Sequence, residues 1–306
     1  MAPQQMQHAV LSYKQTWTGT ERPMTSTVNE LGAAQRARTR ALIVPREHGA
    51  WGLLLIPLFT GVVAGLRSAQ HFWPLLLFVA AAFCLFWLRT PVESLVGSGP
   101  MVARTSAERR VALQTSILLA IASVACLAGL MWGGRNLILL LLGGAAAIAF
   151  VIQAVLRRSR EMRMASQLMG AIGLTATAPA AYYLGTGHFD AHAVALWAAN
   201  WTFAGDQIHF VQLRIHAGRA TGFREKFSRG RFFFIGQGLL LVALTVASLW
   251  RVISPLVIIA FVPALVRGTR WFFQAPEPLD VKKLGWSEVK YGIAFGIFLA
   301  VAFLVR

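Results

Sequence analysis

The stretch that decides the fold is NLILLLLGGAAAIAFVIQAVL at residues 136–156, a run without a single charged residue. A transmembrane helix needs roughly 20 apolar residues to cross about 30 Å of hydrocarbon. Similar charge-free runs lie on both sides of it, at 49–66, 72–88, 111–134, 164–189 and 232–250. The run 191–213 contains one acid, Asp206, while 252–266 and 291–305 reach full length only with their flanks 267–273 and 284–290. The sequence therefore predicts nine membrane-spanning helices.

Composition supports an all-α, polytopic membrane protein. Of the 306 residues, 56% are hydrophobic and only 13% are charged, and the mean hydropathy is +0.58. A soluble domain usually has about a quarter of charged residues, so these values exclude a water-soluble enzyme. The two cysteines, Cys84 and Cys126, lie inside apolar runs and form no disulfide or metal-binding pattern.

The distribution of basic residues predicts the orientation. Between the predicted spans, 25 of the 29 Lys and Arg residues fall in the N-terminal tail and in the loops on the same side of the membrane. Cytoplasmic loops collect Lys and Arg, so we expect a cytoplasmic N-terminus and an outer C-terminus in a bacterial inner (plasma) membrane. The net charge of +17 then has an explanation that needs no nucleic-acid partner.

The chain divides into a tail and a membrane domain. Residues 1–40 are polar, rich in Gln, Thr and Arg, and lack the apolar core of a signal peptide. We expect them to form a disordered, basic cytoplasmic tail. Residues 41–306 then form the nine-helix transmembrane domain.

The predicted sixth span contains the most polar side chains. An ionised group deep in the bilayer costs at least ~2.5–3.5 kcal/mol, so such groups usually face a partner or a cavity. Asp206, His209 and His216 share one helical stripe, and Asn200 and Gln207 share an adjacent one. Asp206 is therefore expected either to fix helix packing by pairing with a nearby His or Arg, or to form the centre of a functional site.

Two further polar clusters lie at predicted inner boundaries. They comprise Arg46, Glu47, His48 and Trp51 at the start of the first span, and Arg89 and Glu93 after the second. The first cluster could equally be an interface cap with a tryptophan anchor. Because both clusters fall on the same side as the inner part of the sixth span, we expect them to meet Asp206 in one inward-facing polar cavity.

Other patterns are weaker. Gly61-xxx-Gly65 and Gly129-xxx-Gly133 match the small-xxx-small pattern of close helix packing. His48 with His209 or His216 could supply the axial ligands of a haem, but no further motif supports one. The sequence thus predicts no cofactor.

The stretch Pro-Arg-Glu-His-Gly-Ala-Trp at 45–51, followed by Gly-Leu-Leu-Leu-Ile-Pro, resembles the signature of the YwiC-like family of bacterial membrane proteins. That family is itself similar to the UbiA-type intramembrane prenyltransferases. The more distant similarity rests on the nine predicted spans, on Arg46 followed by Gly52 and Pro57, and on Asp206 with Arg214 in the sixth span. The resemblance implies a single nine-helix, UbiA-like bundle with an inner-face active site.

The resemblance also implies two Asp-rich motifs that hold a prenyl diphosphate through Mg²⁺, and this chain departs from them. Residues 89–97 contain one acid, Glu93, and Leu213 and His216 stand where further acids are expected around Asp206. No two of the twelve acids are four residues apart, as carboxylates on one face of a helix would be. The sequence therefore predicts no metal site, and Mg²⁺-dependent diphosphate chemistry lacks its ligands.

We expect an enzyme-like membrane protein, a degenerate prenyltransferase-like one if catalytic, that binds an isoprenoid, a quinone-like molecule or another membrane lipid. Asp206, His209 and His48 would be the catalytic acid/base groups. The binding residues would be Arg46, Glu47, Trp51, Arg89, Glu93, Asn200, Gln207 and Arg214. The alternative is a non-catalytic lipid or cofactor carrier, a transporter, or a membrane subunit that docks to an electron-transfer complex.

Overall fold

The computed structural model describes residues 24–45, 48–66, 68–69, 72–134, 137–159, 161–218, 220, 222–275 and 279–305, with side chains from residue 33 onward except that of His48. Every regular element in this part of the chain is an α-helix, which confirms the all-α prediction. The helices are α2 (Met24–Ile43), α3 (His48–Leu66), α4 (Trp73–Val96), α5 (Ser106–Trp132), α6 (Leu137–Leu156), α7 (Arg163–Thr175), α8 (Thr177–Thr186), α9 (Ala191–His216), α10 (Phe223–Leu249), α11 (Pro255–Phe273) and α12 (Val281–Leu304).

Seven of these helices are long and apolar enough to cross a membrane, and they indicate a multi-pass membrane protein: α3, α4, α5, α6, α10, α11 and α12. Large apolar side chains stay exposed on them, among them Leu118 at 68% and Leu140 at 58%. Water would disfavour such apolar faces, whereas lipid would cover them. The seven helices correspond to seven of the nine predicted spans.

The two other predicted spans differ from the rest. The span 164–189 is divided into α7 and α8. Pro179 has no N–H to offer the carbonyl of Thr175, so one helical hydrogen bond is missing at the division. The span 191–213 lies in α9, which has 26 residues and is long enough to cross a membrane. It is not among the seven apolar helices above because it contains polar side chains such as those of Asn200 and Asp206.

The chain forms two compact units, and the smaller one comprises residues up to Val44 together with 89–116. Its α2 occupies residues 24–40 of the segment that we expected to be disordered. Ala, Glu, Gln and Arg favour helix even in a polar stretch. Arg38 donates to Glu108 at 2.5 Å, and Glu108 also accepts from the backbone N–H groups of Arg104 and Thr105. These bonds tie α2 to the first turn of α5.

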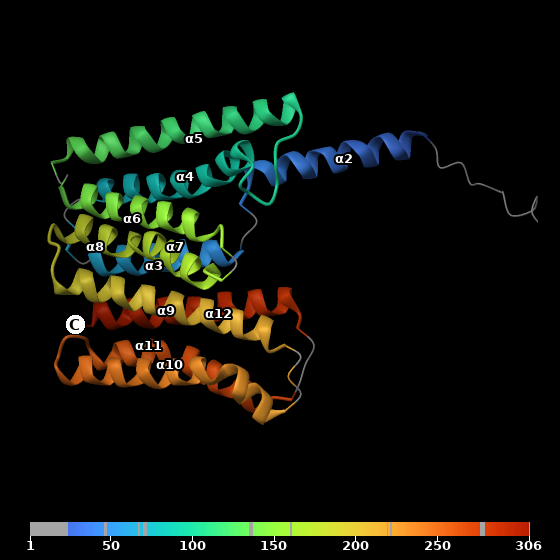
Figure 1. Ribbon diagram of the computed structural model, residues 1–306. Helices are drawn as coiled ribbons and strands as arrows, with labels where there is room; N and C mark the ends of the chain where they lie inside the picture. The colour runs from blue at the N-terminus through green and yellow to red at the C-terminus, as the bar shows by residue number, and fades with distance from the viewer. Residues whose placement is uncertain are drawn as a thin grey trace, which may run out of the picture. The chain divides into compact units, whose positions relative to one another are not determined.

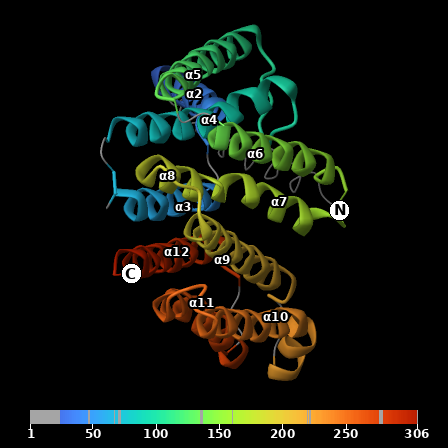
Figure 2. The ribbon, with the colours of Figure 1, turned by 90° about the vertical axis from the view of Figure 1, so that its left-hand side faces the viewer.

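The larger unit comprises residues 45–88 and 117–306. Within it α3 packs along α8, α10 along α11, and α11 along α12 (Figures 1 and 2). The α3–α8 contact depends on small residues, because a Cβ atom at Gly61 would lie 2.3 Å from the carbonyl oxygen of Ala178. The predicted small-xxx-small packing is therefore confirmed for Gly61.

An aromatic core fills the centre of this unit next to the polar part of α9. The rings of Phe203 and Phe295 stack with centroids 3.8 Å apart, and Phe261 packs edge-on against both. All three side chains are at most 3% exposed. Because Phe203 lies one turn before Asp206 on α9, this core holds the carboxylate at the junction of α9 with α11 and α12.

Candidate functional site

Asp206 lies at the centre of a buried charged cluster, which we call the Asp–Arg–Glu cluster and define as Asp206 (α9), Gln237 (α10), Arg267 (α11) and Glu288 (α12). The guanidinium of Arg267 donates from Nη2 to Asp206 Oδ2 at 2.6 Å and from Nη1 to Glu288 Oε2. The amide of Gln237 donates to Asp206 Oδ1. Four helices thus contribute one polar side chain each to a single connected network.

The cluster is nearly sealed from solvent. The side chains of Arg267 and Asp206 are 5% and 4% exposed, and that of Glu288 is 11% exposed. Buried ion pairs of this kind pay a desolvation penalty of several kcal/mol per ion, which the attraction between the charges offsets only when hydrogen bonds complete the geometry. A polar network this deep among apolar helices therefore indicates a constraint beyond general packing.

Aromatic rings cover the faces of the Arg267 guanidinium. Its Cζ atom lies 4.3 Å from the ring centroid of Phe210 on α9 and 5.3 Å from that of Tyr291 on α12. A guanidinium over an aromatic ring gains about 2 kcal/mol when desolvated. These rings fix the plane of the guanidinium between the two carboxylates.

The hydrogen bonds within the cluster do not use all of its polar atoms. Among the described residues, Glu288 Oε1, Gln237 Oε1 and Arg267 Nε are buried and have no hydrogen-bond partner. Leaving such a group unpaired costs about 1–3 kcal/mol. The cluster can therefore accept one or more further hydrogen bonds and donate one.

The cluster lies toward one end of its helices. At ~1.5 Å per residue, Asp206 is about 15 Å from the end of α9, Arg267 about 9 Å from the end of α11, and Glu288 about 10 Å from the start of α12. These ends lead into the segments 217–222 and 274–280. Both segments belong to the side for which the charge distribution predicts the cytoplasm.

A second set of cations lies nearer these segments, around Trp271. The ammonium of Lys226 is 5.1 Å from the indole centroid and donates to the carbonyl oxygens of Trp271 and Gln274 at 3.2 and 2.7 Å. It thereby caps the C-terminus of α11, where the helix dipole favours a cation. The Arg214 guanidinium lies 5.9 Å from the same ring. This predicted binding residue also lies 6.0 Å from the ring centroid of Phe210, the ring that covers one face of the Arg267 guanidinium.

Other predicted site residues of the larger unit have different partners. Asn200 donates to Thr60 Oγ1 of α3 at 3.0 Å, and Gln207 donates to the backbone carbonyl of Glu288 at 2.9 Å. His209 packs its ring edge-on against Phe233, with centroids 5.1 Å apart. Trp51 packs on Phe83 and Phe86, and its indole N–H reaches the carbonyl of Pro45. Asn200 and Gln207 thus bind neighbouring helices to α9.

Two of the remaining predicted residues pair with each other, and three lie outside the part of the chain whose side chains the structure describes. Arg89 and Glu93 belong to the smaller unit and pair with each other at 2.9 Å, one turn apart on α4. Arg46, Glu47 and the side chain of His48 lie outside the described residues. The expected meeting of the three clusters in one cavity therefore stays a prediction.

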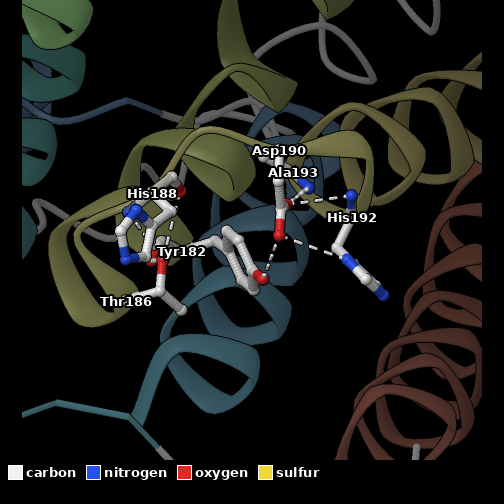
Figure 3. A network of polar contacts seen from close by, with 6 residues as sticks. All are labelled: Tyr182, Thr186, His188, Asp190, His192 and Ala193. Carbon is white, nitrogen blue, oxygen red and sulfur yellow. Dashed lines mark hydrogen bonds and ion pairs between the residues drawn. The ribbon is translucent and has the colours of Figure 1, made fainter.

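The opposite end of α9 carries an exposed network, shown in Figure 3. Asp190 caps α9 by accepting from the backbone N–H groups of His192 and Ala193, and its other oxygen contacts Tyr182 Oη and His192 Nδ1. Burial acts to raise the pKa of Asp190, but the hydrogen bonds from Ala193 and His192 outweigh it and hold this pKa below its ordinary value. The network serves as a helix cap.

Metal binding finds no support in the side chains that the structure describes, because no three His, Cys, Asp or Glu residues among them are grouped so as to hold an ion. Asp206 and Glu288 are the two carboxylates of the cluster, and Arg267 already binds both. A guanidinium in this place offsets part of the negative charge that a cation would otherwise compensate.

Sequence reasoning missed three members of the cluster, namely Gln237, Arg267 and Glu288, and also the buried Lys226. Arg267 ends one charge-free run, and Glu288 lies two residues before Lys290, which bounds another, so both residues fall in the predicted flanks of their spans. The sequence did contain a signal for this pair. Arg267 and Glu288 have opposite charges, and each lies in a flank without which its predicted span is too short to cross the membrane. Asp206, the residue that the sequence did single out, is confirmed as a buried polar residue of α9.

Comparison with known proteins locates the similarity in the first part of the chain. The comparisons with curated proteins and with solved structures found no match. The family model described as YwiC-like protein matches residues 44–182, a little under half of the chain, so this segment is similar to YwiC-like proteins.

Proposed function

We propose that the chain is an enzyme-like protein of the bacterial inner membrane that binds the polar head of an isoprenoid, quinone-like or other lipid molecule at the Asp–Arg–Glu cluster. The observation that carries this proposal is a connected set of buried polar and charged side chains from α9, α10, α11 and α12, some of whose atoms have no hydrogen-bond partner among the described residues. Charged groups in membrane helices are expensive, and they usually mark a ligand or ion path.

Nine crossings would place this site in the cytoplasmic half of the membrane. In this proposal α7 and α8 form one bent crossing, because together they extend over residues 163–186, and α9 forms another. At ~1.5 Å per residue each of these is longer than the ~30 Å hydrocarbon core. The N-terminus is then cytoplasmic and the C-terminus lies outside, as the positive-inside rule predicts.

The cluster supplies the groups that a polar head would need. Arg267 Nε can donate to a carbonyl or hydroxyl oxygen, while Glu288 Oε1 and Gln237 Oε1 can accept from a hydroxyl. Asp206, already held by two donors, would keep Arg267 in place. Exposed apolar faces such as that of α10 would pack against acyl or isoprenoid chains.

Lipid analysis of the purified full-length protein tests this proposal. We expect an isoprenoid or quinone-like lipid to co-purify with the wild type, and to be reduced at least tenfold in Gln237→Leu. The matched control is Gln212→Leu, which changes the same residue type on α9, where Gln212 binds Gln167 outside the cluster. Equal amounts of lipid in both variants would remove the cluster from the binding site.

A titration with short-chain lipids gives an independent readout. A ligand that binds only the folded protein raises stability by about 2.7 kcal/mol at one hundred times its Kd. We expect a saturable rise in Tm with a short-chain quinone or a prenyl alcohol. If neither compound changes the Tm of the wild type and no lipid co-purifies, lipid binding is refuted.

A carrier or subunit without chemistry of its own is the second candidate, and one observation favours it. Arg267 binds both carboxylates, so the cluster fastens α9, α11 and α12 to one another as a purely structural bond would. Such a protein would bind its lipid and release it unchanged. Incubation with an isotope-labelled form of the co-purified lipid, followed by mass spectrometry, separates the candidates, because only an enzyme changes the mass.

A further inference from the structure

The four carboxylate oxygens of the Asp–Arg–Glu cluster are not equivalent. Asp206 Oδ1 accepts from Gln237, Asp206 Oδ2 accepts from Arg267, and Glu288 Oε2 accepts from the other arm of Arg267. Glu288 Oε1 is buried and has no hydrogen-bond donor among the residues that the structure describes. One oxygen of the four is thus unlike the others.

We infer that Glu288 carries an exchangeable proton on Oε1, and that the Asp–Arg–Glu cluster is a proton-binding site within the membrane. A protonated carboxyl group has one O–H donor, so the orphaned acceptor becomes a donor. The inference goes beyond the proposed function: it rests on the same site but requires no lipid.

Charge balance leads to the same oxygen. Two ionised carboxylates against one guanidinium would leave a net negative charge in a nearly sealed interior, at a cost of several kcal/mol. One proton makes the cluster neutral. Asp206 is the less favourable place for it, because both of its oxygens already accept hydrogen bonds from donors that a neutral carboxyl would bind more weakly.

Charges on the neighbouring helices do not replace this proton. Lys226 is bound to the carbonyl oxygens at the end of α11, and Arg214 lies over the rings of Phe210 and Trp271 and acts on Glu288 only at a distance. From Gly49 to Leu66, α3 contains no ionisable residue. Two other ionisable groups on these helices are the half-buried His209 and Tyr291, whose ring covers Arg267. The rest are exposed or half-buried: His192, His216, Arg224, Glu225, Arg229, Arg231, Arg270, Lys282, Lys283 and Lys290.

A protonated Glu288 would extend what the cluster can do. The O–H group would be the only acidic proton donor of the four members, and Arg267 contributes an unpaired N–H to the same network. A carbonyl or hydroxyl that reached the cluster could take up the proton, and Arg267 would then bind two ionised carboxylates. Glu288, and not Asp206, becomes the acid/base group.

Infrared spectroscopy of the purified full-length protein in lipid nanodiscs tests this inference. A protonated carboxyl has a C=O stretching band distinct from that of a carboxylate. We expect this band at neutral pH, a small shift in D₂O because the proton exchanges, and a larger shift when glutamate side chains carry ¹³C. A shift with ¹³C-labelled aspartate instead would place the proton on an aspartate and overturn the inference, as would absence of the band.

Two variants assign the band to one residue. Glu288→Gln should abolish it while retaining the folded protein, because the amide reproduces the shape of the neutral acid, with an oxygen for Arg267 and N–H donors at the Oε1 position. The matched control Glu225→Gln breaks an exposed pair with Arg229 and should leave the band unchanged. Loss of folded Glu288→Gln protein would contradict a neutral Glu288.

Comparison with Asp206→Asn strengthens the assignment. Its amide would direct donors at Arg267 or Gln237, so we expect a larger loss of Tm than for Glu288→Gln. The reverse order would indicate that Asp206 is the neutral member and would overturn the inference. None of these measurements involves a lipid ligand, so failure of lipid binding and failure of proton binding remain distinguishable.

Discussion

Arg267 is the only cation in direct contact with Asp206 and Glu288 among the described residues, and its removal gives the first prediction at the scale of single residues. Arg267→Leu leaves the ionised Asp206 and the carboxyl group of Glu288 buried without a positive charge. We expect it to lower the free energy of unfolding by about 3–5 kcal/mol, as for other broken buried pairs. Thermal or chemical unfolding of the detergent-solubilised protein measures this loss.

Arg229→Leu is the control for this prediction, because Arg229 pairs with Glu225 one turn away with both side chains exposed. An exposed pair contributes less than about 1 kcal/mol. A triple variant that makes residues 206, 267 and 288 all leucine should also be more stable than Arg267→Leu alone, since no charge is then left unpaired. Similar losses for Arg267→Leu and Arg229→Leu would refute the view of a tightly coupled cluster.

At the scale of single residues, the sequence identified Asp206 but not the residues of the cluster that bind it. Asp206 was identifiable because it lies well inside an otherwise uncharged run. Arg267 and Glu288 were not, since each lies near the end of its run and a charge there normally marks the membrane boundary. The pairing of charges lowers their cost inside the helices, and pairing depends on which helices are neighbours.

The contact between α3 and α8 gives a prediction at the scale of elements. In Gly61→Ala the new Cβ atom would lie 2.3 Å from the backbone oxygen of Ala178. Since the obstacle is backbone, the two helices must move apart, and overpacking of this kind costs about 1–3 kcal/mol. We expect a lower Tm and weaker protection of α8 amides from hydrogen exchange.

Gly143→Ala is the matched control, because nothing lies within 4 Å of a Cβ atom at this position of α6. Alanine is intrinsically favoured over glycine in a helix, so stability should be unchanged or slightly higher. If Gly61→Ala were as stable as Gly143→Ala, the close approach of α3 and α8 would be contradicted.

The cap of α9 gives a second prediction at this scale. Asp190→Ala removes the acceptor for two backbone N–H groups and should cost about 0.5–2 kcal/mol. Because the pKa of Asp190 is lowered in the folded protein, its ionised form stabilises the fold above the unfolded pKa of about 3.9. That contribution is lost as the pH falls through the folded pKa.

Unfolding measured at several acidic pH values checks the sign of this effect. Asp190→Asn keeps an acceptor for the cap but has no charge to titrate, so its stability should decline less toward acidic pH than that of the wild type. An equally steep decline in both proteins would show that Asp190 does not contribute to the pH dependence.

The observed helix ends show which helices the sequence predicts and which it does not. Apolar length located the long helices, because hydrocarbon tolerates only a helix whose backbone groups are satisfied internally. It did not locate the division between α7 and α8, although Pro179 signals it. It also did not indicate α2, where helix-forming residues outweigh a polar composition.

The number of crossings gives a prediction at the scale of the whole molecule. In a variant without Cys84 and Cys126, a single cysteine at the exposed His188 should react with a membrane-impermeant maleimide in intact cells. A cysteine at the exposed Ser159 should react only after permeabilisation. These two positions flank α7 and α8, so labelling on the same side would mean that the pair does not cross.

The sequence by itself determined that this is a helical membrane protein, because the cost of placing polar backbone and charges in hydrocarbon acts on every stretch of chain independently. It also determined that Asp206 needs a partner. Only the tertiary structure decided that the partners of Asp206 are Arg267 and Gln237 and that Arg267 also binds Glu288. It also decided that one carboxylate oxygen of Glu288 has no donor among the described residues. Hydrogen bonds between side chains far apart in the chain depend on the packing of whole helices, which no single span encodes.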